Sequence, residues 1–366
     1  MAVHEHYMAR ALQLAERGLF TTDPNPRVGC VLVKDGQTIG EGYHQRAGDP
    51  HAEVYALLDA GQQSKDADCY VTLEPCSHTG RTSPCADALI KAGVKRVFIA
   101  MMDPNPLVSG TGIEKLKNAG IEVSVGLLQQ QAEKLNPGFC QRMRVGRPYV
   151  RSKIAMSIDG RTAMSSGESQ WITGSDARQD VQRLRARSSA ILTGIGTVLA
   201  DDPALTVRPE GDWYPDIQAV RQPLRVVVDS QLQIAEQAKI FHDEGDVLIA
   251  STVADKSSVK AEIITLPAKS QQVDLHALMT ELAQREINDV LVEAGSVLNG
   301  ALLQENLIDE LIIYMAPKLM GDLAKGLFHL PELQTMAQNI DLSISDIRAI
   351  GNDWRITAIL NYSENK

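Results

Sequence analysis

The chain has 366 residues, of which 44% are hydrophobic and 22% are charged, and it carries a net charge of −10. This length predicts two globular domains, each large enough to bury a hydrophobic core of its own. The acidic balance argues against a general nucleic-acid binder, because such proteins present a basic face to the phosphate backbone.

In the first part of the chain, helical patterns alternate with short apolar runs that suit strands. Helices are expected at 6–17, 51–60, 84–92 and 112–119. Strands are expected at 28–33, 38–43, 69–73, 96–101 and 121–125. Asp35-Gly36 lies between the first two strands and predicts a hairpin turn. The alternation is typical of an α/β layer fold.

A domain boundary is expected near Gly146-Arg147-Pro148, after a polar and basic stretch at 136–145. We therefore predict one domain at 1–146 and a second at 147–366. Helices of the second domain are expected at 176–187 and from Gly295 onward. Its strands are expected at 149–156, 190–193, 225–229, 247–250, 290–293, 311–315 and 354–360. Residues 209–222 indicate an ordered loop insertion in this second α/β series.

Four residues of the first domain form a pattern that indicates catalytic zinc. His51 opens a predicted helix and Glu53 follows two residues later, while Cys76 ends a predicted strand and Cys85 comes nine positions after it. A catalytic zinc ion takes three protein ligands and leaves one position for water. The sequence therefore predicts His51, Cys76 and Cys85 as ligands and Glu53 as the group that moves protons. This is the signature of zinc deaminases, in which activated water attacks an amidine carbon and ammonia leaves.

The spacing of the two cysteines departs from the usual C-x-x-C of such deaminases. Eight residues separate Cys76 from Cys85, so we expect the intervening segment to loop out and line the pocket. The alternative is that the cysteines are buried hydrophobes and His51 is an ordinary helix-start residue. The occurrence of all four groups in order, at a helix start and a strand end, favours zinc.

The second domain carries weaker signals for phosphate and proton chemistry. Gly295 and Gly300 lie in a strand–turn–helix segment at 288–301, where backbone N–H groups at a helix start suit phosphate. The segment lacks a G-x-G-x-x-G fingerprint, so an ordinary strand–helix connection is an equally good interpretation. Several arginines could supply guanidinium forks for phosphate, or could form a solvated helix face. They are Arg183, Arg185, Arg187 and Arg208.

Longer stretches of sequence resemble one known family. The run TLEPCSHTGRTSPC, with HAE before it and Asn25-Pro26-Arg27-Val28-Gly29 earlier, is similar to the bifunctional deaminase/reductases of riboflavin biosynthesis. The segments RSKIAMSIDGRTA and VLVEAGSVLNGALL resemble the reductase half of the same family, in the same order. The resemblance implies a cytidine-deaminase-like three-layer domain followed by a dihydrofolate-reductase-like domain.

The resemblance also implies the reactions and the cofactors, Zn²⁺ and NADPH. The first reaction is deamination of 2,5-diamino-6-(5-phosphoribosylamino)pyrimidin-4(3H)-one, and the second is NADPH-dependent reduction of the product's ribosyl group to a ribityl group. In the deaminase, Asn25, His44 and His78 would contact the base, and Arg81 would face the phosphate.

For the reductase, the resemblance places a set of residues on NADPH. They are Ala155, Trp171, Thr197, Asp201, Ser230, Gly295, Ser296, Val297, Leu298, Asn299, Gly300 and Ala301. A second set would contact the substrate: Ser169, Arg185, Leu205, Arg208 and Glu293. Lys153 would assist at the sugar carbon. Either Lys153 or Asp201 could supply the proton, and the sequence leaves that choice open.

Two other function classes are compatible with parts of the sequence. A single-function deaminase of a nucleoside or tRNA base would leave the second domain as a binding module, but the acidic charge disfavours tRNA. A zinc-stabilised interaction protein would not explain Glu53 beside a three-ligand site, because structural zinc prefers four protein ligands.

The remaining expectations concern partners and location. Five cysteines make a poor disulfide framework and favour reduced thiols in the cytoplasm. No apolar run approaches roughly 18 residues, so no membrane span is expected. The acidic net charge argues against a nucleic-acid partner. The expected partner is a small phosphorylated aminopyrimidine. By resemblance, we expect a homodimer or a larger assembly paired through sheets.

Overall fold

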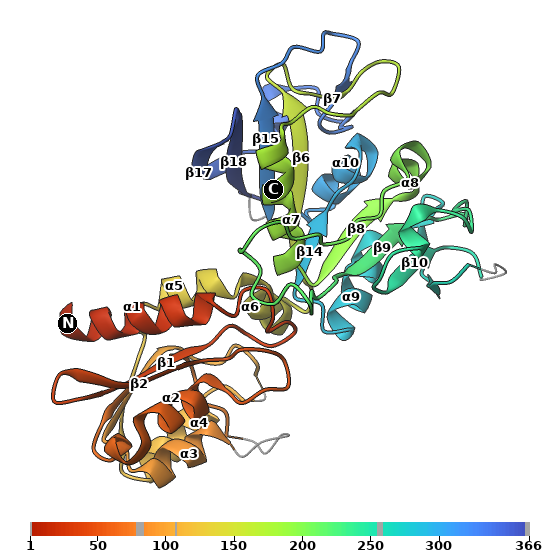
Figure 1. The fold of residues 1–366 in the computed structure, drawn as a ribbon. Helices are drawn as coiled ribbons and strands as arrows, with labels where there is room; N and C mark the ends of the chain where they lie inside the picture. The colour runs from red at the N-terminus through yellow and green to blue at the C-terminus, as the bar shows by residue number, and fades with distance from the viewer. Residues whose placement is uncertain (1, 78–83, 107, 255–258, 363–366) are drawn as a thin grey trace. The chain divides into compact units, whose positions relative to one another are not determined.

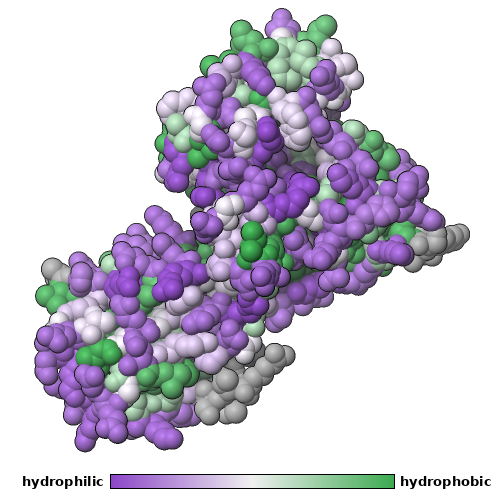
Figure 2. Space-filling view, viewed as in Figure 1, coloured by the Kyte–Doolittle hydropathy of each residue, from purple (hydrophilic) through white to green (hydrophobic). Residues whose placement is uncertain are grey.

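The computed structural model describes residues 2–77, 84–106, 108–254 and 259–362. Its internal contacts divide the chain into unit 1, Met1–Gly146, and unit 2, Arg147–Lys366. Figure 1 shows both units as α/β structures, and hydrophilic residues cover most of the visible surface in Figure 2. Within the described residues, every helix is too short or too polar to cross a membrane.

Unit 1 is built on a five-stranded sheet with the order β2-β1-β3-β4-β5. The strands are β1 Gly29–Lys34, β2 Gln37–Tyr43, β3 Asp68–Leu73, β4 Arg96–Met101 and β5 Glu122–Val125. Strand β1 is antiparallel to β2 and β3, whereas β3, β4 and β5 run parallel to one another. Side chains alternate between the two faces of a strand, so this sheet has two apolar faces to cover.

Helices cover both faces of this sheet, as Figure 1 shows. One face packs against α1 Ala2–Glu16, α5 Gln129–Leu135 and α6 Pro137–Val145. The other packs against α2 Ala52–Ala60, α3 Cys85–Ala92 and α4 Thr111–Asn118, with the 3₁₀ turn η1 Gly61–Ser64 after α2. On β1, Cys30 and Leu32 face the second group while Val31 and Val33 face the first. The predicted three-layer arrangement is confirmed.

Unit 2 contains a nine-stranded sheet with the order β11-β10-β9-β8-β14-β6-β15-β18-β17. The strands are β6 Tyr149–Ser157, β8 Ala190–Gly194, β9 Leu224–Val228, β10 Val247–Ser251, β11 Glu262–Thr265, β14 Asp289–Val292, β15 Glu310–Ala316, β17 Leu342–Ile350 and β18 Asp353–Leu360. The first seven in this order are parallel, and β18 is antiparallel to both β15 and β17. Unit 2 also contains two short strand pairs, β7 Arg161–Ala163 with β16 Lys325–Gly326 and β12 Ala268–Lys269 with β13 Gln272–Val273. Two 3₁₀ turns lie in its loops, η2 Lys239–Phe241 and η3 Met336–Gln338.

Four helices cover the large sheet. Helices α9 Leu275–Gln284 and α10 Ser296–Gln304 pack on one face, whereas α7 Ser175–Arg187 and α8 Ile195–Asp201 pack on the other. Because α8 follows β8 and α10 follows the neighbouring strand β14, both helices begin at the same edge of the parallel sheet. In open α/β sheets this edge, at the carboxyl ends of the strands, is where ligands bind.

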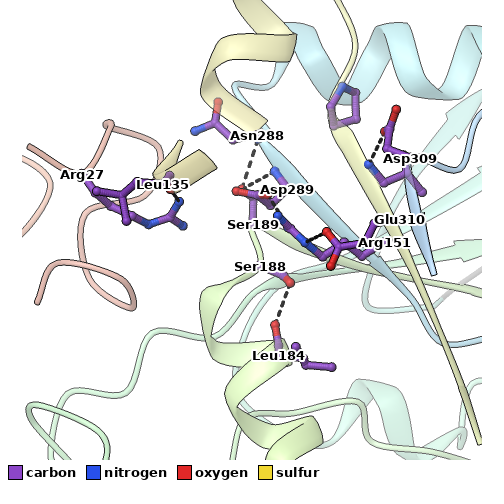
Figure 3. Close-up of polar contacts among 12 residues, drawn as sticks. Arg27, Leu135, Arg151, Leu184, Ser188, Ser189, Asn288, Asp289, Asp309 and Glu310 are labelled. Carbon is purple, nitrogen blue, oxygen red and sulfur yellow. Dashed lines mark hydrogen bonds and ion pairs between the residues drawn. The ribbon is translucent and has the colours of Figure 1, made fainter. Parts of the chain in front are cut away.

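A fully buried arginine joins three neighbouring strands of this sheet, as Figure 3 shows. The guanidinium of Arg151 on β6 pairs with Asp289 on β14 at 2.5 Å and with Glu310 on β15 at 3.0 Å. It also lies 4.6 Å from the centre of the Tyr149 ring. Burial works to lower the pKa of Arg151, but the two carboxylates outweigh it and hold that pKa above its ordinary value. A charge this well paired can stay inside the sheet, where an isolated one could not.

The structure corrects several secondary-structure predictions. The polar and basic stretch at 136–145, for which no helix was predicted, contains helix α6, which begins at Pro137 and buries Phe139 and Cys140. Helices α5, α8 and α9 and strands β7, β11, β12, β13, β16 and β17 were not predicted either, and the first helix begins at Ala2 rather than at residue 6. The loop at 209–222 is confirmed, since it contains neither helix nor strand.

Candidate active sites

Three side chains of unit 1 converge where β3 ends and where α2 and α3 begin. His51 immediately precedes α2, Cys85 is the first residue of α3, and Cys76 follows β3. His51 Nδ1 lies 3.2 Å from Cys85 Sγ and 3.6 Å from Cys76 Sγ, and all three ligand atoms lie within 4.8 Å of one another. Tetrahedral zinc, with bonds of about 2.0–2.3 Å, separates its ligand atoms by roughly 3.4–3.8 Å. The donor set therefore fits zinc in both chemistry and spacing.

The protonation of the two thiols also points to a cation. Hydrogen bonding with Cys85 and with His51 lowers the pKa of Cys76 to about 4. Hydrogen bonding with Cys76, together with burial, raises the pKa of Cys85 well above its ordinary value. Two thiolates at this separation repel each other, so both are ionised only when a cation lies between them.

Glu53 is the buried acid of this site. It is the second residue of α2, and only 3% of its surface is exposed. Burial is the main cause that raises the pKa of Glu53 to about 7, against the opposing effect of the nearby His51. A carboxyl group with this pKa can both accept and return a proton near neutral pH.

Two further predicted residues lie next to this cluster. The Asn25 side-chain amide donates to His44 Nε2 at 3.0 Å, and His44 Nδ1 donates to the Pro50 carbonyl at 3.1 Å, so one neutral tautomer satisfies both bonds. Burial lowers the pKa of His44, and its ring centre lies 5.5 Å from that of His51. Asn25 and His44 are therefore beside the metal ligands, whereas the predicted His78 and Arg81 lie outside the described residues.

In unit 2, the structure joins three of the predicted residues in one ion cluster. Glu293 lies just after β14 and pairs with Lys153 of β6 at 3.0 Å and with Arg185 of α7 at 2.6 Å. Burial opposes ionisation of Glu293, but Arg185 and Lys153 lower its pKa to about 2. Lys153 keeps 18% of its side chain exposed, so it is the member of the cluster that can contact a ligand.

Three of the arginines considered as phosphate ligands have other contacts in the structure. The Arg185 guanidinium donates from Nε and Nη2 to the Glu293 carboxylate. Its remaining nitrogen, Nη1, donates to the Thr206 carbonyl at 3.0 Å. Arg183 lies over the Trp213 ring, 5.6 Å from its centre. Arg208 is exposed, and its backbone N–H donates to Gln182. Arg185 is thus placed to hold Glu293 rather than to present a free fork.

The residues predicted for NADPH lie along the carboxyl ends of neighbouring strands. Gly295 N–H, before α10, donates to the Thr197 hydroxyl on α8 at 3.3 Å, which links the two helix starts. The hydroxyl of Ser152, on β6, donates to the Asn299 side chain at 2.7 Å, and that side chain donates in turn to the Ala294 carbonyl. These bonds fix the backbone of the turn.

The predicted turn residues are not equivalent. Gly295 and Val297 are exposed, Ser296, Leu298 and Ala301 are partly exposed, and Asn299 and Gly300 are buried. A Cβ at Gly300 would lie 2.3 Å from the His329 carbonyl oxygen, so packing explains that glycine. The start of α10 is therefore the part that can approach a phosphate.

Other predicted residues lie on neighbouring loops. Ser169 donates to Asp201 at 3.2 Å, whereas the adjacent Asp202 accepts from the Lys239 backbone, so the two aspartates diverge. Trp171 is 63% exposed and stacks under the Arg178 guanidinium. The remaining predicted positions differ in exposure: Ala155 is partly exposed on β6, Leu205 is buried against α8, and Ser230 is buried with its hydroxyl bonded to Gln272.

Comparison with known proteins gives matches to both units. The model of the cytidine and deoxycytidylate deaminase zinc-binding region matches residues 1–101, and the model of the RibD C-terminal domain matches residues 148–356. The chain is 55% identical over 357 residues to the riboflavin biosynthesis protein RibD of Escherichia coli, covering 95% of this chain and 97% of the relative. It is 51% identical to the Haemophilus influenzae protein of the same name, covering 96% of each.

Solved structures give the same result. RibD of Acinetobacter baumannii matches with a TM-score of 0.93 at 48% identity and covers 99% of each chain. The diaminohydroxyphosphoribosylaminopyrimidine deaminase/5-amino-6-(5-phosphoribosylamino)uracil reductase of Thermotoga maritima matches with a TM-score of 0.87 at 33% identity, covering 98% of this chain and 99% of the other. Both similarities extend over the two units together.

We predict that Cys85→Ser removes zinc from the purified protein, because a hydroxyl is a poor replacement for a thiolate ligand. Metal analysis should find about one zinc per wild-type chain and well under half of that in the variant. Cys140→Ser is the control, since this buried cysteine belongs to α6, which packs on the opposite face of the sheet. Full zinc occupancy in Cys85→Ser would contradict the ligand assignment.

Proposed function

The chain belongs to the RibD family of riboflavin-biosynthesis proteins, and on this premise we propose which of its residues carry out the family's two reactions. The protein is a bifunctional enzyme, a zinc-dependent deaminase and an NADP-dependent reductase, which uses Zn²⁺ and NADPH. Unit 1 has the cytidine-deaminase-like fold and unit 2 the dihydrofolate-reductase-like fold. Deamination of 2,5-diamino-6-(5-phosphoribosylamino)pyrimidin-4(3H)-one precedes reduction of the ribosyl group to a ribityl group.

For the deaminase, we assign zinc to His51, Cys76 and Cys85. The observation that supports this most directly is the convergence of their three ligand atoms beside the buried Glu53. Zinc held by these three residues would lower the pKa of a water molecule in the site toward neutrality and so supply the nucleophile. As the water oxygen bonds to the amino-bearing carbon, Glu53 would carry one of its protons to the ring nitrogen and then the other to the amino group, so that the C–N bond breaks, ammonia leaves and the ring gains a carbonyl.

Asn25 and His44 orient the pyrimidine in this assignment. Both lie beside His51, and the pKa of His44 is lowered by burial, which keeps its ring neutral and fixes its tautomer. A fixed tautomer gives a fixed pattern of donor and acceptor. We propose that this pair recognises the polar edge of the base.

For the reductase, we assign Lys153 as the proton donor at the sugar carbon. NADPH supplies the hydride. Lys153 is partly exposed and held by Glu293, which Arg185 anchors from the other side, so its ammonium has a fixed direction. Asp201 is exposed and bonded to Ser169, and among the described residues no hydrogen bond or ion pair links it to Lys153. We therefore assign Asp201 to positioning of ligands.

We also propose that two copies of the chain pair through the end of the unit 2 sheet. The register of β17 and β18 puts Ile344, Ile347 and Trp354 on one face of this hairpin, where they are 61%, 54% and 48% exposed. Helix α7 packs on the opposite face, against Tyr314 and Ile350. In a two-fold dimer the same surface of both copies forms the interface, so two such apolar strips would cover each other. A second copy of the chain is therefore the partner that we propose for this strip. Nucleic acid is not expected as a partner, and cytoplasmic location stays a prediction.

Glu53→Gln tests the proton-transfer role. The amide keeps the size of the side chain but cannot carry a proton to ammonia, so the rate of ammonia release should fall by at least about 100-fold. Zinc content should remain at the wild-type level, and NADPH oxidation with the deaminated substrate should be unchanged. Deamination near the wild-type rate would rule out this role for Glu53.

Lys153→Met tests the reductase assignment. With the deaminated substrate, the rate of NADPH oxidation should fall by at least about 100-fold, while ammonia release from the first substrate is retained. NADPH binding, followed by its fluorescence, should persist. Lys269→Met is the control, because Lys269 pairs with Glu305 at an exposed position. If Lys153→Met reduces the substrate normally and Asp201→Asn does not, Asp201 is the proton donor instead.

Ile347→Asp tests the paired assembly. A charge in the apolar strip should convert a dimeric or larger protein into monomers at micromolar concentration, as measured by sedimentation velocity, with both units still folded. Ile359→Asp is the matched control, since Ile359 is 36% exposed on the opposite face of the same hairpin. A monomeric wild-type protein, or equal dissociation by both variants, would refute the proposed interface.

A further inference from the structure

Glu74 lies between strand β3 and the metal ligand Cys76, and neither proposed reaction uses it. Only 3% of its surface is exposed. Its carboxylate accepts hydrogen bonds from four backbone N–H groups, which lie between the end of β4 and the first turn of α4. The donors are Asp103 at 3.1 Å and Gly110 at 3.0 Å to Oε2, and Gly112 at 3.0 Å and Ile113 at 3.3 Å to Oε1.

Three of these donors belong to the N-terminal end of α4. The first N–H groups of a helix have no partner within the helix, and they carry partial positive charge. The residue before α4 is Gly110, which has no side chain to cap them. Glu74 takes the place of the missing cap from a distant part of the chain, and its negative charge is favourable there.

Two more contacts join the same helix turn to the segment that carries Cys76. A Cβ at Gly112 would lie 2.0 Å from the Pro75 carbonyl oxygen, so the backbones touch at this point. The hydroxyls of Ser77 and Thr111 are 2.6 Å apart and share a hydrogen bond. The first turn of α4 therefore contacts the residues on both sides of Cys76.

We propose that Glu74 is a positioning residue of the zinc site, which holds the turn at 74–77 against α4 and so fixes Cys76 relative to His51 and Cys85. Cys76 needs this support because it lies in neither a helix nor a strand, unlike Cys85, which begins α3. Outer groups that orient metal ligands typically contribute 10–100-fold to metal affinity. The inference rests on the proposed zinc site.

The test is Glu74→Gln in the full-length holoenzyme. The amide nitrogen cannot accept the N–H groups that one carboxylate oxygen now accepts, so the turn should loosen. Competition with a chromophoric chelator should show zinc affinity lowered by about 10–100-fold. The Co²⁺-loaded variant should show weakened thiolate-to-metal and ligand-field absorption, because the geometry of one sulfur ligand is no longer fixed.

Glu114→Gln is the matched control, since Glu114 lies in the same turn of α4 but is exposed. It should keep wild-type zinc affinity and Co²⁺ spectrum. NADPH oxidation with the deaminated substrate reports on unit 2 and should be normal in both variants. Wild-type zinc affinity and Co²⁺ absorption in a folded Glu74→Gln protein would overturn the positioning role.

Two additional variants keep the proposal testable. If Glu74→Gln does not fold, Ser77→Ala, which removes only the Ser77–Thr111 bond, should still weaken zinc binding several-fold, and no change would overturn the inference. Cys85→Ser distinguishes failure of the zinc-ligand assignment from failure of the positioning role of Glu74. If Cys85→Ser retains zinc, the metal site itself is wrong; if it loses zinc while Glu74→Gln keeps wild-type affinity, only the positioning role is wrong.

Discussion

Two neighbouring thiols and a buried carboxylic acid share a small space in unit 1, and the balance of charge among them governs the site. The Cys85 thiol donates a hydrogen bond to the Cys76 thiolate, which lowers the pKa of Cys76 and raises that of Cys85, so only one of the two thiols ionises readily. A bound dication would stabilise two thiolates at once, so both cysteines could serve as ligands. Burial raises the pKa of Glu53 to about 7, and we propose that this group exchanges protons with the substrate. The site thus needs burial, zinc and the acid together.

Unit 2 balances buried charge with side chains alone. Glu293 remains ionised although it is buried, because Lys153 and Arg185 both pair with it. Arg185 also donates to the Thr206 carbonyl, so its guanidinium is fully engaged. A buried ion cluster adds little net stability to the fold, although removal of one partner is strongly destabilising. We infer that its role is to hold the charged side chains in one orientation. Here the direction that is fixed is that of the Lys153 ammonium.

The sequence was sufficient where a residue type and its spacing carry the chemistry. The convergence of His51, Cys76 and Cys85 could be predicted because few roles other than metal binding suit these residue types in this order. Glu74 could not, because its partners are backbone N–H groups about 30–40 positions later, which have no side-chain signature. Helix α9 does carry a signal in the sequence, because the capping Asp274 precedes apolar residues at helical spacing. A bulge in β17 interrupts its alternation and obscures that strand.

The two reactions change different parts of one molecule, the amino-bearing carbon of the base and the first carbon of the sugar. Each set of assigned residues accordingly belongs to one unit, and each cluster is held by contacts within that unit. In unit 1, the ligand turn is held through α4; in unit 2, Lys153 is held through Glu293 and α7. The contacts that hold one cluster are therefore separate from those that hold the other, so we expect a substitution in the Glu293 cluster to leave the contacts of the Cys76 turn unchanged.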